Sequence, residues 1–290
     1  MHADEFEITK GLVERLIDEQ FPEWSDLEVS HLNVMGSDNV IFKLGDDKVI
    51  RLPRLESSSE FAERENIWLP KISKHVSIKT SQPVASGKPT SFYPFYWSVC
   101  YWIDGETSFE AKSINYNNLA RDLASFIKEL RNIKLSGAEP LSKRGKSLEV
   151  QVKDVEVALS DLKEEIDVKL ASEIWQDCLN TEEYSGEPVW MHGDLLPSNI
   201  LVKNGHLEAV IDFGLFGVGD PSCDLLPAWC LFDKESRNIF LEELKLDKAS
   251  IMRGKGWALS VAIKILPYFR NTNRELVEVA NKMLTNILSD

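Results

Sequence analysis

The chain has 290 residues, enough for one large domain or two lobes, and its 43% hydrophobic and 28% charged residues are ordinary for a globular protein. Its formal charge is −14, from 47 acidic and 33 basic residues, which disfavours nucleic acid and anionic membranes as partners because both require basic patches. Such a charge would draw a cationic small molecule into an acidic cleft, but acidity also serves solubility alone.

Three features bear on the compartment. Residues 1–10 are acidic and lack the basic-then-apolar order of a signal peptide. The most apolar late stretch, 257–269, is short for a bilayer span and contains Lys264. The four cysteines form no CxxC pair, which favours reduced thiols over a disulfide framework or a zinc site. We therefore expect a cytoplasmic protein without membrane partners. The expected assembly state is a monomer or weak dimer.

The first hundred residues predict a small β-rich part. Apolar residues at helical spacing indicate a helix over 5–21, with Thr9 placed to cap it. Short alternating runs separated by turns then predict strands at 27–32, 40–44 and 48–52. The Gly-Ser-Asp-Asn loop that precedes the second strand could cover phosphates with backbone N–H groups, but on this signal alone a plain hairpin turn is favoured.

Arg51 lies on the third strand, and a helix is predicted over 60–72. The glutamates Glu60, Glu63 and Glu65 on this helix are candidates for an ion pair that would aim Arg51 at phosphates. The alternative is that Arg51 and the glutamates are simply solvated.

The aromatic, β-branched stretch 93–105 predicts one or two buried strands ending at a turn. Such a segment either belongs to the core or reads a purine through its backbone groups. The chain beyond it reads as helical apart from one central hairpin. Helices are predicted at 116–133, 148–166, 171–179, 235–246, 254–269 and 273–288, with a connector at 138–147.

The stretch 189–224 carries the chemistry. A short strand leads into His192-Gly193-Asp194, and two further strands flank Asn204-Gly205, a strong two-residue hairpin turn. Because a hairpin brings its two ends together, Asn199 should lie beside Asp212, with Asp194 on the loop just before them. An amide oxygen, a carboxylate and nucleotide phosphates suit Mg²⁺, which leaves Asp194 to accept a proton from an attacking hydroxyl.

These residues resemble the motifs of a known family. The runs 192–199 (HGDLLPSN), 211–214 (IDFG) and 219–224 (GDPSCD) are similar to those of the aminoglycoside phosphotransferases, a superfamily that includes macrolide phosphotransferases and choline kinases. The resemblance covers about residues 30–230 and implies an α+β, protein-kinase-like two-lobed fold. We expect an antiparallel-sheet N-lobe at 1–103, with a hinge near 98–103, and a helical C-lobe at 104–290.

Carried across by position, the resemblance implies a role for each matching residue. Asp194 would be the catalytic aspartate, and Asn199 and Asp212 would be magnesium ligands. The predicted nucleotide contacts are Ser37, Asn39, Arg51, Glu65, Tyr101 and Ile103. His192 is expected to hold the catalytic loop, and Asp220 and Asp224 to cap or anchor the helix that begins near Ser222.

A protein substrate is disfavoured. The first hairpin has no GxGxxG, and the link from Gly214 to Asp220 leaves no room for a long activation segment. The sequence therefore predicts a kinase that moves the γ-phosphate of ATP or GTP to a hydroxyl of a small cationic antibiotic, with an aminoglycoside as the leading acceptor.

Three alternatives remain open. A macrolide or another amino-alcohol could be the acceptor, and the chain could be a non-catalytic nucleotide-binding module. Aminoglycosides would require clustered carboxylates, whereas a macrolide would need a wide apolar pocket. The candidate acids are Asp233, Glu235 and the pair at 242–243, which could also be solvated helix faces.

Overall fold

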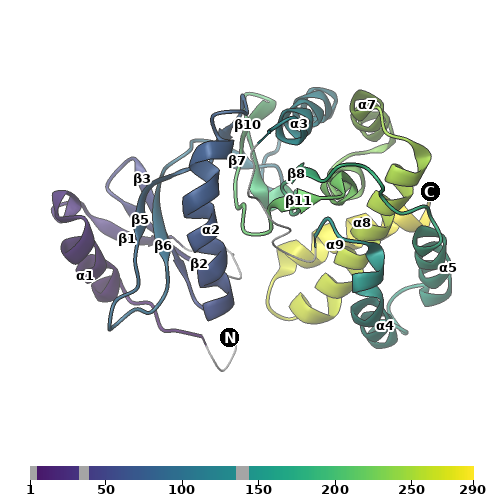
Figure 1. Cartoon of the computed structure of the whole chain (residues 1–290). Helices are drawn as coiled ribbons and strands as arrows, with labels where there is room; N and C mark the ends of the chain where they lie inside the picture. Colours follow the sequence, from purple (N-terminus) through teal and green to yellow (C-terminus); the bar gives the residue numbers. More distant parts are fainter. Residues whose placement is uncertain (1–4, 33–38, 135–143) are drawn as a thin grey trace. The chain divides into compact units, whose positions relative to one another are not determined.

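The structure, a computed structural model, describes residues 5–32, 39–134 and 144–290. The chain separates into two compact units (Figure 1). One comprises Met1–Lys74 with Lys79–Asp104, and the other comprises His75–Ile78 with Gly105–Asp290. Within the described ranges, none of the helices combines the length and the apolar character needed to cross a bilayer.

The first unit is built on a five-stranded antiparallel sheet with the order β1-β2-β3-β6-β5. Its elements are α1 (Lys10–Gln20), η1 (Pro22–Trp24), β1 (Val29–Leu32), β2 (Asn39–Leu44), β3 (Lys48–Pro53), α2 (Glu56–Ile72), β4 (Lys79–Thr80), β5 (Pro83–Gly87) and β6 (Trp97–Tyr101).

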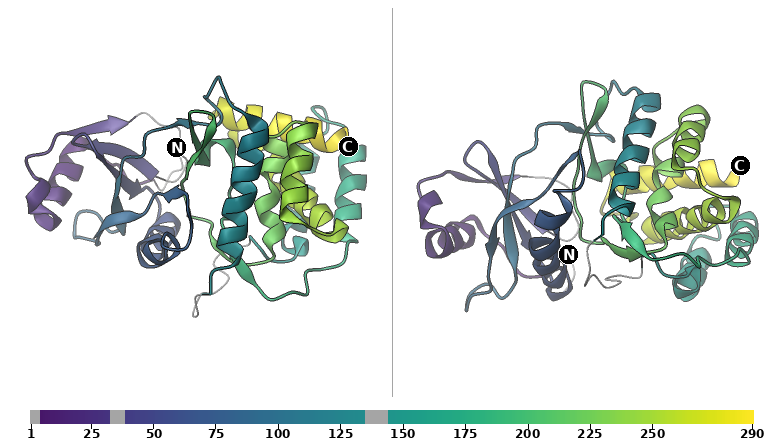
Figure 2. Two further views of the ribbon diagram at one scale, coloured as in Figure 1. Left: turned by 90° about the horizontal axis from the view of Figure 1, so that it is seen from above. Right: turned by 45° about the horizontal axis from the view of Figure 1, so that its top comes forward.

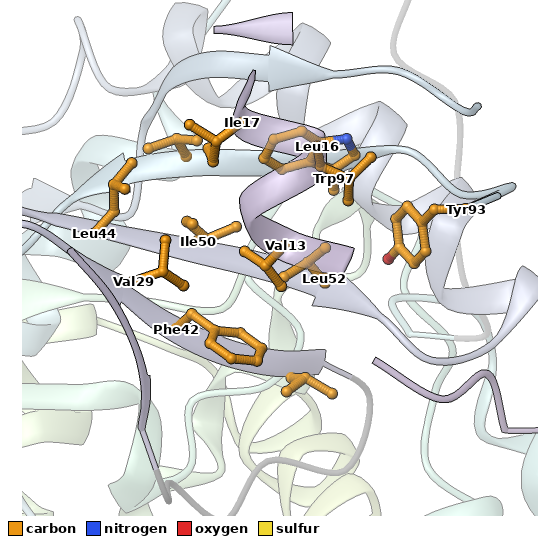
Figure 3. Packing of buried hydrophobic residues seen from close by; sticks show 12 residues of the cluster. Val13, Leu16, Ile17, Val29, Phe42, Leu44, Ile50, Leu52, Tyr93 and Trp97 are labelled. Carbon is orange, nitrogen blue, oxygen red and sulfur yellow. The ribbon is translucent and has the colours of Figure 1, made fainter. Parts of the chain in front are cut away.

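Alternation along β3 sends its side chains to two faces of this sheet. Ile50 and Leu52 join the apolar cluster that Leu16 of α1 covers, together with Phe42 and Trp97 (Figure 3). Arg51, between the two apolar residues, points to the opposite face, which α2 covers. The sheet therefore has a dry core on the α1 side and can present a charged group on the α2 side.

The second unit is mostly helical. Its elements are β7 (Glu106–Thr107), α3 (Tyr116–Arg131), η2 (Leu148–Gln151), α4 (Val152–Asp161), α5 (Val168–Leu179), β8 (Val189–Met191), η3 (Pro197–Asn199), β9 (Ile200–Lys203), β10 (His206–Val210), β11 (Gly217–Gly219), η4 (Pro221–Leu225), α6 (Pro227–Cys230), α7 (Lys234–Leu244), α8 (Lys248–Phe269) and α9 (Arg274–Leu288). Strands β10, β9 and β7 are antiparallel neighbours, and β11 pairs with β8.

Helix starts in this unit follow side-chain capping. A side-chain oxygen of the N-cap residue accepts a bond from a backbone N–H of the first turn, which satisfies a donor that the helix leaves open. This holds for α3, α5, α7, α8 and α9, whose caps are Asn115, Asp167, Asp233, Asp247 and Asn273. The long helix α8 packs along α9 and against η4, so it supports the segment that follows β11 (Figure 2).

The predicted fold class is confirmed, with local corrections. The aromatic stretch 93–105 forms β6, while β7 begins just beyond it. The helix predicted over 148–166 divides into the 3₁₀ turn η2 and the shorter α4, which ends at Asp161. Helix α2 begins earlier than predicted, at Glu56.

All four cysteines are free thiols in buried positions. Burial raises the pKa of Cys100 to about 11 and those of Cys178 and Cys230 to about 12, and it raises the pKa of Cys223 as well. The thiols are therefore protonated at neutral pH and serve as core side chains.

Candidate active site

The loop after β8 turns at Gly193, where φ is +82°. A Cβ atom placed on Gly193 would lie 2.5 Å from the carbonyl oxygen of Leu215. Both the left-handed backbone and the close approach therefore require glycine here. This turn ends strand β8 and presents Asp194.

Asp224 holds the loop after β8 through hydrogen bonds to its backbone. Its two carboxylate oxygens accept bonds from the backbone amides of His192, at 3.0 Å, and Gly193, at 2.7 Å. Burial raises the pKa of this carboxyl, while the two amide bonds and the charges of Arg131 and Arg144 act in the opposite direction. The sequence suggested that Asp224 anchors the helix near Ser222, but its carboxylate accepts hydrogen bonds from the loop after β8 instead.

The second aspartate of the motif, Asp220, does cap the segment that follows. It accepts the amide of Ser222 at 2.9 Å, at the start of η4. Its other oxygen is 2.7 Å from Nε of Arg253 on α8, in a pair with less than a tenth of either side chain exposed. A buried charge needs such a partner, so this pair fixes the chain after β11 to α8.

His192 is fully buried and bonds at both ring nitrogens. Nδ1 accepts the amide of Asp194 at 3.2 Å, so Nε2 carries the proton and donates to the carbonyl oxygen of Ile211 at 3.1 Å. Burial lowers the pKa of His192 to about 4, which keeps the imidazole neutral. These contacts join the catalytic loop to the end of β10, as expected of a residue that holds the loop.

Asn199 orients the carboxylate of Asp194. Its side-chain Nδ2 donates to the main-chain oxygen of Asp194 at 2.9 Å and to Oδ2 at 3.1 Å. The amide nitrogen therefore faces Asp194, and the amide oxygen of Asn199 is directed away from it.

The β9–β10 hairpin brings Asn199 to Asp212, as predicted. The amide of Ile211 donates to the carbonyl oxygen of Asn199 at 3.0 Å, one residue before Asp212. Asp212 itself has φ of +61°, the left-handed region that few residues other than glycine adopt. Such local strain is typical of functional sites, where the surrounding structure holds it.

Arg144 is a neighbour of Asp194 that the sequence did not indicate. Its Nη2 lies 3.7 Å from Oδ1 of Asp194, and the two side chains are 14% and 21% exposed. Arg144 comes from the end of the predicted connector 138–147, far from Asp194 along the chain. Its short-range sequence context contains no signal for this contact.

In the first unit, Arg51 and Glu65 form a buried ion pair at 2.8 Å. Of the three candidate glutamates, Glu65 is the one whose carboxylate the structure places at Arg51. Glu60 is exposed, and Glu63 lies near Tyr96, whose pKa its charge raises. The predicted ion pair therefore exists, and its role toward phosphates stays a prediction.

The other predicted nucleotide contacts also fall in the first unit. Asn39 begins β2 opposite Pro53, and Tyr101 ends β6 opposite Lys48 with its side chain 58% exposed. Ile103 is half-buried just beyond that strand. Ser37 lies outside the described residues. Their contacts with a nucleotide remain predictions.

The candidate acceptor acids are divided. Asp233 caps α7, and Glu235 accepts a bond from Asn117 at 2.8 Å. Both line a polar cavity of about 700 Å³, which Glu106 also lines. Asp194 is not among the residues that line this cavity. Of the pair at 242–243, Glu243 faces Lys128 at 3.2 Å.

A model of the phosphotransferase enzyme family (APH) matches residues 33–256, which is most of the chain and includes every element of the site above. The chain belongs to this family. It is therefore a phosphotransferase, and the resemblance of its motifs is confirmed. Among curated proteins, none matches its sequence significantly.

Solved structures share the fold of this phosphotransferase. The GDP and kanamycin complex of APH(2")-IIia has a TM-score of 0.73 at 18% identity, covering 96% of this chain and 98% of the other. The ADP-bound aminoglycoside phosphotransferase APH(2'')-Ib has a TM-score of 0.61 at 21% identity, covering 97% and 98%. Macrolide 2'-phosphotransferase MphH from Brachybacterium faecium, as apoenzyme, has a TM-score of 0.66 at 18% identity, covering 93% and 97%.

Proposed function

We propose that this phosphotransferase moves the γ-phosphoryl group of ATP or GTP to a hydroxyl of a small antibiotic, with an aminoglycoside as the leading acceptor. The arrangement of Asp194, Asn199 and Asp212 carries the proposal. A carboxylate held by an amide beside a second carboxylate is suited to orient a hydroxyl and to neutralise phosphates.

In the proposed reaction the acceptor oxygen attacks the γ-phosphorus. A new O–P bond forms, the bond between the γ-phosphorus and the β–γ bridging oxygen breaks, and the nucleoside diphosphate leaves. The hydroxyl proton passes to Asp194, which acts as general base. His192 is buried and neutral, so we assign it a holding role alone.

The donor set fits Mg²⁺. The metal prefers hard oxygen ligands and usually takes few from the protein, with phosphates and water completing its shell. The oxygen of Asn199 and the carboxylate of Asp212 are such ligands, at neighbouring ends of one hairpin. When bound, Mg²⁺ would offset the phosphate charge.

We assign the donor nucleotide's contacts to the first unit. The Arg51–Glu65 pair would face the phosphates, and the backbone at Tyr101 and Ile103 would face the purine, with Asn39 and Ser37 near the phosphates. Solved structures of the fold bind GDP in one case and ADP in another, so both donors belong in the test.

Two observations bear on the acceptor. Kanamycin occupies one structure of the same fold, and the net charge of −14 favours a cation. A macrolide is the second candidate, because the charged neighbour of Asp194 described above is a guanidinium, Arg144, and the fold also occurs in a macrolide phosphotransferase. A guanidinium is a poor neighbour for a polycation.

The test is phosphate transfer by the purified chain. Labelled ATP or GTP, each with and without Mg²⁺, is offered with a panel of aminoglycosides, macrolides and amino-alcohols. We expect Mg²⁺-dependent product with at least one compound, and Asp194→Ala should lower kcat by about 10²–10⁴-fold while nucleotide still raises the melting temperature. Transfer to none of the compounds by the wild-type chain would reject the proposal, and nucleotide binding without any turnover would favour the binding-module alternative.

A further inference from the structure

The catalytic loop of this phosphotransferase has no cation of its own. Residues 192–199 contain neither lysine nor arginine, and the second residue after Asp194 is the buried Leu196. Phosphoryl transfer spreads negative charge over the moving group, and kinases and related enzymes meet it with metal ions and with a basic side chain supplied from the loop or from elsewhere. Because this loop has no basic residue, a cationic side chain beside Asp194 must come from another segment.

Arg144 places such a cation beside Asp194. Its guanidinium is an ion-pair partner of Asp194, with Nη2 3.7 Å from Oδ1. Asn199 holds the other oxygen, Oδ2, at 3.1 Å. The two oxygens of the carboxylate thus face two different partners, a charged guanidinium at ion-pair distance and a neutral amide that donates a hydrogen bond.

The stem of Arg144 is packed against the turn that presents Asp194. A Cβ atom built on Gly193 would lie 3.3 Å from both Cβ and Cγ of Arg144. The guanidinium carbon lies 5.4 Å from the ring centre of Trp257, a fully buried residue of α8. Contact with an aromatic face favours a cation, so this packing fixes the guanidinium in position.

The backbone beside Arg144 is anchored too. The carbonyl oxygen of Gly145 accepts the amide of Asp220 at 2.8 Å, and Asp220 is in turn paired with Arg253. The carboxylate of Asp224 also senses the charge of Arg144, which lowers its pKa against the effect of burial. The ion pair with Asp194, the packing on Gly193 and the contact with Trp257 therefore hold the side chain of Arg144, and the backbone of the next residue is anchored as well.

We propose that Arg144 is a positioning residue for Asp194, whose charge supports phosphoryl transfer in place of a basic residue in the catalytic loop. It draws Oδ1 to one side while Asn199 holds Oδ2, so the carboxylate keeps one orientation toward the acceptor hydroxyl. This inference rests on the proposed function. It adds a residue that the sequence did not single out.

The variants Arg144→Ala and Arg144→Lys test it in the full chain, with Arg274→Ala as matched control. Arg274 is an 88% exposed arginine of α9, so its loss changes net charge equally. We measure kcat and KM for the nucleotide and the acceptor, melting temperature with and without GDP or ADP, and kcat of Arg144→Ala with added millimolar guanidinium.

We expect Arg144→Ala to lose about 10²-fold in kcat, as a misplaced catalytic group does, with KM for the nucleotide nearly unchanged. Arg144→Lys or added guanidinium should return part of the loss, because each restores a cation. Arg274→Ala should match the wild-type chain.

Two results would overturn the inference. One is a kcat of Arg144→Ala equal to that of the wild-type chain. The other is a loss that neither lysine nor guanidinium restores, which marks a purely structural residue even if Arg144→Ala folds poorly. A wild-type chain that phosphorylates nothing would remove the proposed function itself, so the two failures are distinct.

Discussion

The two ends of the β9–β10 hairpin share a backbone conformation and differ in what holds it. At the turn, Asn204 and Gly205 have φ of +54° and +79° in a two-residue loop. At the other end, Asp212 has φ of +61° beside Asn199 and the catalytic loop. The turn needs this conformation because its twist matches that of the strands.

At Asp212 the conformation is not required by any tight turn between strands. Asparagine and aspartate adopt it more readily than most residues other than glycine, but outside a tight turn such a residue still has to be held by its surroundings. The local contacts at that end include the bond from His192 to the carbonyl oxygen of Ile211. The left-handed backbone is thus set by the local turn at one end of the hairpin and by contacts within the candidate site at the other end.

Exchanging the two polar residues would test this contrast most strongly. Asp212→Asn keeps the tolerance for a left-handed backbone but removes the carboxylate, so we expect kcat to fall by about 10²–10³-fold with little change in folding stability. Asn204→Asp, its matched control, should leave kcat unchanged. Transfer assays at saturating Mg²⁺ measure both, and equal kcat values in the two variants would contradict the assignment of Asp212.

A second test of the same contrast replaces Gly193 and Gly205 by alanine, which adds one methyl group at each position. Gly193→Ala faces both a left-handed φ and a carbonyl oxygen at 2.5 Å, so we expect a loss of about 3 kcal/mol in unfolding free energy. At Gly205 the nearest atom lies 3.9 Å away, so Gly205→Ala should lose only about 1 kcal/mol, from the backbone alone. Urea unfolding gives both values. Equal losses would mean that the catalytic turn relaxes.

The pH dependence of stability should depend on His192. The buried imidazole has a lowered pKa of about 4, so between its usual pKa near 6.5 and pH 4 the unfolded chain binds a proton that the folded chain does not. Stability therefore falls as pH drops through this window, by up to about 3 kcal/mol from this group, and levels off below it. His192→Asn should be less stable at neutral pH but have a shallower pH slope, measured by urea unfolding from pH 7 to 4. An unchanged slope would rule His192 out as its source.

The features that the sequence predicted correctly are those determined by residues close together in the chain. Asn204-Gly205 defines its own turn, and Thr9 caps the first helix because both signals act within a few residues. The hairpin then brings Asn199 to Asp212 by geometry. The sequence offered three glutamates of one helix as partners of Arg51, and the structure pairs Glu65 with it.

Other features depend on contacts between distant segments. Arg144 lies next to Asp194 although about fifty residues, including α4 and α5, separate them along the chain. The connector that contains Arg144 has the composition of a polar linker, which gives no sign of this contact. Asp224 was expected at a helix start because aspartate often caps helices, yet it accepts two amides from the loop after β8. Neither partner follows from periodicity or local propensity.

The buried cysteines allow the local unfolding of each unit to be measured separately. Cys100 lies in β6 of the first unit, whereas Cys178, Cys223 and Cys230 lie in the second. A protonated, enclosed thiol reacts with an alkylating reagent only when its surroundings open and water enters. The rate at which mass is added at each thiol therefore follows the local unfolding of that unit. Adding nucleotide during such labelling would reveal which of the two it steadies.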